Sequence, residues 1–212
     1  MEESFEHIVY SKNVIEFVTV AKEYCTFLET ADEINRKQFV TVATRIIPLL
    51  YLKASVLPKV EPELEETIEK TVDEMTYAQI QEGVTAKLGR FNDYLEVFNT
   101  DMQRSDTPVI AFIGEDMADI YQDLKDFISA YRLGVTEIMN DALAEVVTNF
   151  ELYWGQRMVN TLRALHAVLH GEDDLTEEEG EEEFQQNQQQ ENWYMRMQQD
   201  WQDDNDEDTP LL

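Results

Sequence analysis

Residues 136–170, TEIMNDALAEVVTNFELYWGQRMVNTLRALHAVLH, decide the fold class of this chain. Apolar side chains recur there every three or four residues, a spacing that places them on one side of an α-helix. The members of this apolar side are Met139, Leu143, Val147, Phe150, Trp154, Met158, Leu162, Leu165 and Leu169. The stretch therefore predicts one long amphipathic helix.

The sequence that precedes this stretch shows the same helical spacing. It predicts helices over 11–29, over 36–57 with a kink or break at Pro48, from about Pro62, over 77–88, and over 109–133 with Gly134 closing the helix. Residues 90–108 are the least regular, and no alternating pair of segments indicates a strand pair. The predicted fold is all-α, an up-and-down helical bundle of about five or six helices over residues 1–171.

The end of the chain has a different composition. Residues 171–212 hold 16 acidic residues and one basic residue, whereas the 170 residues before them hold 29 acidic and 15 basic residues. The Glu- and Gln-rich segment 172–212 is predicted to be a disordered acidic tail, because it cannot bury enough apolar surface to offset the entropy of ordering. Trp193, Met197 and Trp201 share one helical side within it, and either dock on a partner protein or are simply solvated.

Composition also excludes several classes of partner. The net charge of −29 and the lack of a basic stripe argue against direct binding of nucleic acid or of an anionic membrane surface. No apolar run is long enough to cross a membrane, and the acidic N-terminus does not resemble a secretory signal. Cys25 is the single cysteine, so no internal disulfide can form. We expect a cytoplasmic protein without a cofactor.

Several charged residues fall on or beside the apolar sides of the predicted helices. On a helical wheel, Glu151 and Arg157 fall within the apolar side of the last helix, and Lys53 within that of the second. Along the helix predicted over 109–133, three aspartates form a column at the border of the apolar side. The charges that are candidates for a ligand pocket are Lys53, Asp116, Asp119, Asp123, Glu151 and Arg157.

Two interpretations of these charges remain open. Buried charges are costly unless they are paired, so the favoured interpretation is a salt-bridge network that fixes how the helices pack. The alternative is a polar pocket between helices that holds a small ligand or a divalent metal. His166 and His170 have the spacing of a helical metal pair, but their position on the polar side near a helix end favours an ordinary surface role, and no metal is assigned.

Four stretches carry a resemblance to a known family. They are NVIEFVTVAKEYCTFLE (13–29), IIPLLYLKASVLP (46–58), EDMADIYQDLKDF (115–127) and YWGQRMVNTLRALHAVLHG (153–171). The chain resembles the uncharacterised bacterial helical proteins known as domain of unknown function 5063, from about residue 11 to residue 171. The resemblance implies a compact helical domain in a soluble bacterial protein. Its motifs draw attention to Trp154 and His166 as two further ligand-pocket candidates. It implies no catalytic role, because the family has no established activity.

The sequence therefore leaves the function unknown, with two hypotheses from different classes. The preferred one is a non-enzymatic helical interaction or scaffold protein, in which the tail or an exposed groove recruits a protein partner. The other is a small-ligand or metal-binding protein that uses the charges between its helices. The sequence decides neither whether the chain is an enzyme nor its oligomeric state.

Overall fold

The helix predicted over 136–170 is present as one run with a wide turn in its middle. The computed structural model describes residues 7–64, 68–96 and 109–176. Helix α5 (Thr136–Asn149) leads through a π-helical turn (Phe150–Trp154) into α6 (Gly155–His170). The N–H of Gly155 donates to the carbonyl oxygen of Phe150 across this turn. A Cβ atom at position 155 would lie 2.4 Å from that oxygen, so the turn requires glycine.

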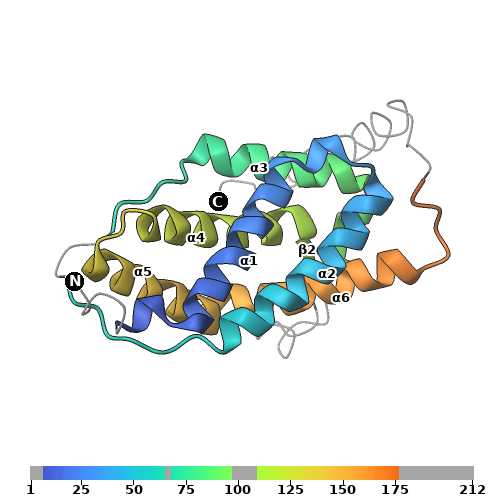
Figure 1. The fold of residues 1–212 in the computed structure, drawn as a ribbon. Coiled ribbons are helices and arrows are strands. Elements are labelled where there is room, and N and C mark those ends of the chain that lie inside the picture. The colour runs from blue at the N-terminus through green and yellow to red at the C-terminus, as the bar shows by residue number, and fades with distance from the viewer. Residues whose placement is uncertain (1–6, 65–67, 97–108, 177–212) are drawn as a thin grey trace, which may run out of the picture. The chain divides into compact units, whose positions relative to one another are not determined.

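Four further helices are present in the described segments (Figure 1). They are α1 (Lys12–Glu29), α2 (Arg36–Ser55), α3 (Glu74–Leu88) and α4 (Ile113–Tyr131). Helix α4 contacts α1, α3, α5 and α6, and it buries residues on most of its circumference. The all-α prediction is confirmed. No helix in the described segments combines the length and the apolar character that a membrane crossing needs.

Local signals account for several helix ends. Asn35 and Gln38 form a capping box at the start of α2, and Asp73 accepts from the N–H of Thr76 at the start of α3. Gly134 has a φ of +71° beyond the end of α4, as its predicted closing role requires. Helix α2 continues through Pro48, which lies at an exposed position, so the break that was one of the two expectations there is absent.

A short β-hairpin is present where no strand pair was predicted. Strand β1 (Asp93–Leu95) pairs antiparallel with β2 (Ile110–Phe112), and Tyr94 lies opposite Ala111. Residues 110–112 therefore belong to a strand, and α4 begins later than predicted. With three residues each, the strands are too short for a period of two to stand out in the sequence.

The helix predicted from Pro62 was wrong. Residues 56–73, here called the strap, join α2 to α3, and their described parts, 56–64 and 68–73, contain no helix. Side chains of α4 and α5 accept hydrogen bonds from backbone N–H groups of the strap. These tertiary contacts satisfy backbone donors that a helix would otherwise have used.

The first of the chain's two compact units is residues 1–176. It extends a little beyond the predicted boundary at residue 171, because Leu175 is buried in the same hydrophobic core as the helices. The second unit, 177–212, lies outside the described residues, and so do the docking candidates Trp193, Met197 and Trp201.

Candidate functional site

Asp116 of α4 is the most deeply buried of the candidate charges, with 1% of its surface exposed. Its Oδ1 accepts from Nη1 of Arg157 at 2.5 Å. Its Oδ2 accepts from the hydroxyl of Tyr94 at 2.5 Å and from that of Thr161 at 3.1 Å. A carboxylate with three such donors is well satisfied without any ligand.

Asp119 lies one helical turn further along α4, and both of its carboxylate oxygens also accept hydrogen bonds from protein side chains. Its Oδ1 accepts from the hydroxyl of Tyr77 at 2.8 Å, and its Oδ2 from that of Tyr153 at 2.6 Å. Nε of Arg157 lies 3.3 Å from the same Oδ2, and the guanidinium lies over the ring of Tyr153, 4.7 Å from the centroid. One arginine therefore bridges both aspartates and packs on an aromatic ring.

We call this group the α4 network: Asp116, Asp119, Arg157, Tyr77, Tyr94, Tyr153 and Thr161. Its members come from α3, β1, α4, the π-helical turn and α6. The network thus connects the hairpin and α3 to the long C-terminal helix through the central helix α4.

The pKa values of the network reflect its burial. Burial raises the pKa of Asp116 above its ordinary value, although the hydrogen bonds from Tyr94 and Arg157 oppose the rise. Burial and the hydrogen bond to Asp119 raise the pKa of Tyr153 to about 12. For Arg157, burial alone would lower the pKa, but Asp116 raises it above its ordinary value. At neutral pH the tyrosines therefore stay protonated as donors and Arg157 stays charged.

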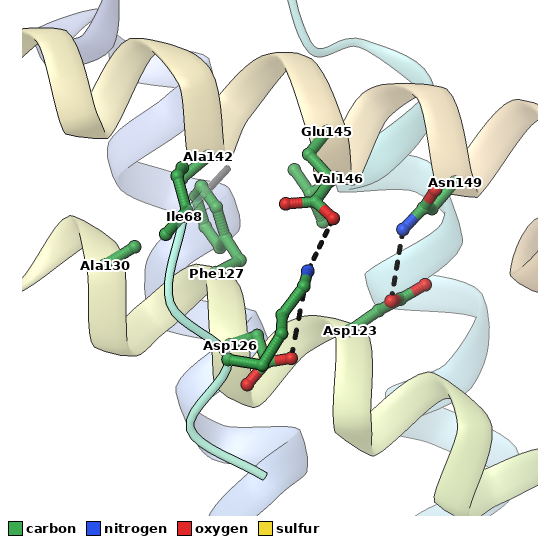
Figure 2. A pocket seen from close by; sticks show the side chains of 10 residues that line it. Ile68, Asp123, Asp126, Phe127, Ala130, Ala142, Glu145, Val146 and Asn149 are labelled. Atoms are coloured by element: carbon green, nitrogen blue, oxygen red, sulfur yellow. Dashed lines mark hydrogen bonds and ion pairs between the residues drawn. The ribbon is translucent and has the colours of Figure 1, made fainter. Parts of the chain in front are cut away.

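Asp123, the third aspartate of the column, lies apart from the α4 network. Its Oδ1 accepts from the amide Nδ2 of Asn149 at 3.1 Å, and burial raises its pKa to about 6. It borders a cavity of about 10 Å³, enough for about one water molecule, between α4, α5 and the strap (Figure 2). Lys70 of the strap lies 2.5 Å from Glu145 and 3.9 Å from Asp126 in the same wall.

Lys53 and Glu151 are not part of the α4 network. Lys53 pairs with Glu16 of α1 at 2.7 Å. The side chain of Glu151 is 44% exposed and pairs with Lys59 of the strap at 2.7 Å. A helical wheel gives only an angle around the axis, and the structure places Glu151 beside Lys59 of the strap.

Trp154 and His166 also lie apart from one another. Trp154 is fully buried against the ring of Phe150, with centroids 4.8 Å apart, and its indole N–H has no acceptor among the described residues. His166 is exposed on α6, where its ring lies 4.6 Å from that of His170. Within the described segments, no three His, Cys, Asp or Glu side chains are grouped as a metal would require.

A second cavity, a groove of about 370 Å³, lies between the strap and α5. Asp141, Glu145 and Glu151 line it, and each of these carboxylates already has a hydrogen-bond or ion-pair partner. Asp116, Asp119 and Arg157 line neither this groove nor the cavity beside Asp123. The charges of the α4 network therefore close on one another, and neither of these two cavities opens onto them.

Comparison with known proteins identifies the family. The family model described as "Domain of unknown function (DUF5063)" matches residues 8–171 of the chain. The chain belongs to the DUF5063 family. The crystal structure of protein BF1032 from Bacteroides fragilis is similar to this DUF5063 chain, with 45% sequence identity and a TM-score of 0.70. The match covers 79% of this chain and 98% of that one. No curated protein matches the chain.

The three tyrosines and Thr161 of this DUF5063 chain were not among the predicted site residues. Thr161 follows Arg157 by four residues on the same helix, so helical spacing offered a signal for it. Tyr94 lies in the stretch predicted as irregular, and only the unforeseen hairpin turns it toward Asp116.

The sequence also gave no signal for the side chains that hold the strap of the DUF5063 domain. Asp126 is 6% exposed and accepts from the N–H groups of Thr71 and Val72 at 2.7 and 3.0 Å. Asp141 is 7% exposed and accepts from those of Glu63 and Leu64 at 2.6 and 2.9 Å. Asn140 donates to the carbonyl oxygen of Glu61 at 2.7 Å. These buried polar groups have a structural use, which is to fix the strap, whose described parts contain no helix or strand.

Proposed function

We propose that this chain is a non-enzymatic interaction protein whose helical body offers a docking surface to a protein partner. The observation that carries the proposal is an apolar stripe on the solvent side of α2, here called the α2 stripe. Its members and their exposed fractions are Val42 (38%), Leu49 (44%), Leu52 (56%) and Val56 (44%). Their spacings of seven, three and four residues place them on one side of the helix.

The position of the α2 stripe supports a docking role. The opposite side of α2 is filled by buried residues that pack on α1 and α6. On the neighbouring long helix, Leu152 is 82% exposed and Val159 46% exposed. Scattered apolar residues are ordinary on a protein surface, but several exposed apolar residues on one side of one helix are typical of an interaction site.

The internal hydrogen bonds of the α4 network also favour the interaction protein over the small-ligand or metal-binding protein. Each oxygen of Asp116 and Asp119 has a hydrogen-bond donor from the protein, so a ligand or metal would have to displace one. Replacing well-formed buried hydrogen bonds costs free energy that a weakly bound ligand does not return. The carboxylates are therefore better explained as structure than as a binding site.

Site-specific photo-crosslinking in the source cells tests the proposal. A photo-reactive phenylalanine analogue at Leu52 should give a discrete protein adduct, and the adduct should disappear when Leu49→Asp is added. The matched control is the same analogue at Met75 of α3, which is 76% exposed but outside the α2 stripe. Identical adducts at both positions, or none at either, would refute a docking role for this surface.

Calorimetric titration addresses the small-ligand hypothesis. Mg²⁺, Mn²⁺ and Zn²⁺ are titrated into the full chain and into its Asp123→Asn variant. We expect no heat of specific binding in either protein. Saturable binding to the unmodified chain that the variant lacks would favour the ligand-binding function instead.

A further inference from the structure

The two helices around the proposed docking surface lack acidic residues altogether. Residues 34–60, which include α2, contain no Asp or Glu, and neither do residues 152–171, which include α6. The two stretches together contain 47 residues. Residues 1–171 hold 29 acidic residues, so 47 residues with the same frequency would contain about eight. These two stretches instead carry seven basic and no acidic residues, whereas the other 124 residues of 1–171 carry eight basic and 29 acidic residues.

The fold brings the two acid-free stretches together. Helices α2 and α6 pack side by side, and Tyr51 near the end of α2 contacts Phe150 ahead of α6, with ring centroids 5.2 Å apart (Figure 1). Lys37 at the start of α2 acts electrostatically on Asp174, just beyond the end of α6. The helices therefore run in opposite directions, and two separate parts of the sequence form one surface without acidic side chains of its own.

Four of the seven basic side chains in these two stretches have internal partners, and one of them, Arg36, donates to the carbonyl oxygen of Lys87. Lys53, Lys59 and Arg157 are engaged by Glu16, Glu151 and Asp116. In contrast, Arg45 and Arg163 are exposed and form no ion pair within the described segments.

The exposed arginines are interleaved with exposed apolar side chains. Arg45 lies between Val42 and Leu49 along the α2 stripe, at spacings of three and four residues. Arg163 follows Val159 by four residues on the outer side of α6. We call the α2 stripe, Val159 and these two arginines the α2–α6 face.

We propose that the α2–α6 face docks an acidic, amphipathic segment of a partner protein, in which apolar side chains meet the α2 stripe and carboxylates meet Arg45 and Arg163. This inference rests on the proposed interaction function and adds the chemistry of the partner. Exposed arginine beside apolar surface is the composition that interaction hot spots favour, and arginine recognises carboxylates in a two-pronged geometry.

The net charge of the chain does not prevent this contact. At physiological ionic strength, charges more than about 8 Å apart on the surface are largely screened. A short acidic segment therefore responds mainly to the local face, and its apolar contacts supply most of the affinity. A long polyanion such as a nucleic acid would extend beyond the face onto acidic surface, where like charges repel it.

Fluorescence anisotropy with a defined probe tests the proposal. The probe is a labelled 18-residue synthetic helix with leucines on one side and glutamates on the other, titrated with the full chain. We expect saturable binding that Arg45→Glu combined with Arg163→Glu weakens at least ten-fold. The matched control combines Lys22→Glu with Arg132→Glu, which changes the net charge equally at exposed positions outside the face, and it should weaken binding less than two-fold.

Other outcomes would overturn the proposal or assign the α2–α6 face to a different ligand. Equal losses in the two double variants, or equally tight binding of a probe with lysines in place of glutamates, would overturn the proposal. Binding of phosphatidylglycerol vesicles in place of the probe would assign the face to an anionic lipid surface. A protease site can also be inserted after Thr176 of the full chain. If this protein binds the probe only after cleavage, the face is assigned to the chain's own acidic segment.

Two further readouts separate the possible failures. Circular dichroism melting of each variant shows that a lost affinity is not lost folding. If the probe fails to bind while the Leu52 crosslink persists, the acidic chemistry is refuted and the interaction function is not. If the probe does not bind and the Leu52 crosslink is also absent, the interaction function is refuted as well.

Discussion

Arg157 of α6 donates from Nη1 to Oδ1 of Asp116 on α4 at 2.5 Å, and it joins a side chain that is about two-thirds buried to an almost fully buried one. This pair joins two helices that meet at the centre of the fold. Removing one partner of such a pair leaves the other charge buried and uncompensated, and that state is much less stable than either the intact pair or an apolar replacement of both.

The first prediction concerns this pair. Arg157→Met should lower the free energy of unfolding by about 3–5 kcal/mol, because Asp116 loses its counter-charge while it remains buried. Urea denaturation followed by circular dichroism measures the change. The control Arg163→Met removes an exposed arginine from the same helix and should change stability by no more than about 0.5 kcal/mol.

The double variant Asp116→Asn with Arg157→Met makes the test independent of whether the single variant folds. It removes both charges together, so it should be more stable than Arg157→Met alone. If Arg157→Met and Arg163→Met cost the same, the α4 network does not stabilise the fold as described.

The second prediction concerns pH and Asp123. Burial raises its pKa from 3.8 to about 6, so the folded protein holds the proton more tightly than the unfolded chain does. The contribution of Asp123 to stability is therefore greatest below about pH 4, and it is lost as the pH rises to about 6. Asp123→Asn should remove this loss. The free energy of unfolding of the variant minus that of the unmodified protein should therefore be greater at pH 7 than at pH 4, by on the order of 1–3 kcal/mol.

The measurement is the free energy of unfolding of both proteins at intervals between pH 4 and 7.5. Other groups titrate in this range, so the informative quantity is the difference between the two curves. Asp32→Asn, at an exposed position after α1, serves as the control, and its curve should run parallel to that of the unmodified protein. A parallel curve for Asp123→Asn would contradict the burial of this carboxylate.

Helical periodicity was sufficient to predict the fold class and much of the site. It identified Asp116 and Arg157 as charges that needed partners, and the structure pairs them. It could not identify Tyr94 as a partner, because that contact depends on a three-residue strand that local sequence does not specify.

Periodicity also predicted a helix from Pro62, within the strap, that the described residues do not show. The acidic residues after Pro62 suit the first turn of a helix, but the described parts of the strap, 56–64 and 68–73, contain no helix. Asp126 and Asp141 accept hydrogen bonds from backbone N–H groups of these parts. Those aspartates lie 54 to 78 residues away in sequence from the N–H groups that they bind, so only the tertiary structure reveals the competition. Propensity is a weak guide wherever distant side chains satisfy the backbone.

The third prediction concerns the strap. Asp141→Ala removes the acceptor for the N–H groups of Glu63 and Leu64 and should cost about 1–3 kcal/mol of stability. The pKa of Asp141 is lowered, since these hydrogen bonds outweigh the opposing effect of burial. Its contribution is therefore present above about pH 4 and is lost as the pH falls below that value.

Hydrogen exchange locates this effect. In Asp141→Ala, amide exchange should accelerate most at Glu63 and Leu64, whereas amides in the middle of α1 should change only as far as global stability changes. Ser55→Ala, at an exposed position just before the strap, is the control and should leave the exchange of both amides unchanged. Acceleration spread evenly over the protein would mean that Asp141 has no special role in fixing the strap.

The last prediction compares two glycines inside helices. A Cβ atom at position 155 would lie 2.4 Å from the carbonyl oxygen of Phe150 and 3.0 Å from its ring, whereas a Cβ atom at position 83 of α3 would meet nothing within 4 Å. Gly83→Ala should therefore raise stability by up to about 1 kcal/mol, since alanine is the better helix former and the new methyl group has room. Gly155→Ala should lower stability by at least about 1 kcal/mol, because the methyl group forces the π-helical turn and the ring of Phe150 to move. Thermal unfolding of the two variants measures the contrast, and equal gains would show that the wide turn before α6 does not depend on a missing side chain at position 155.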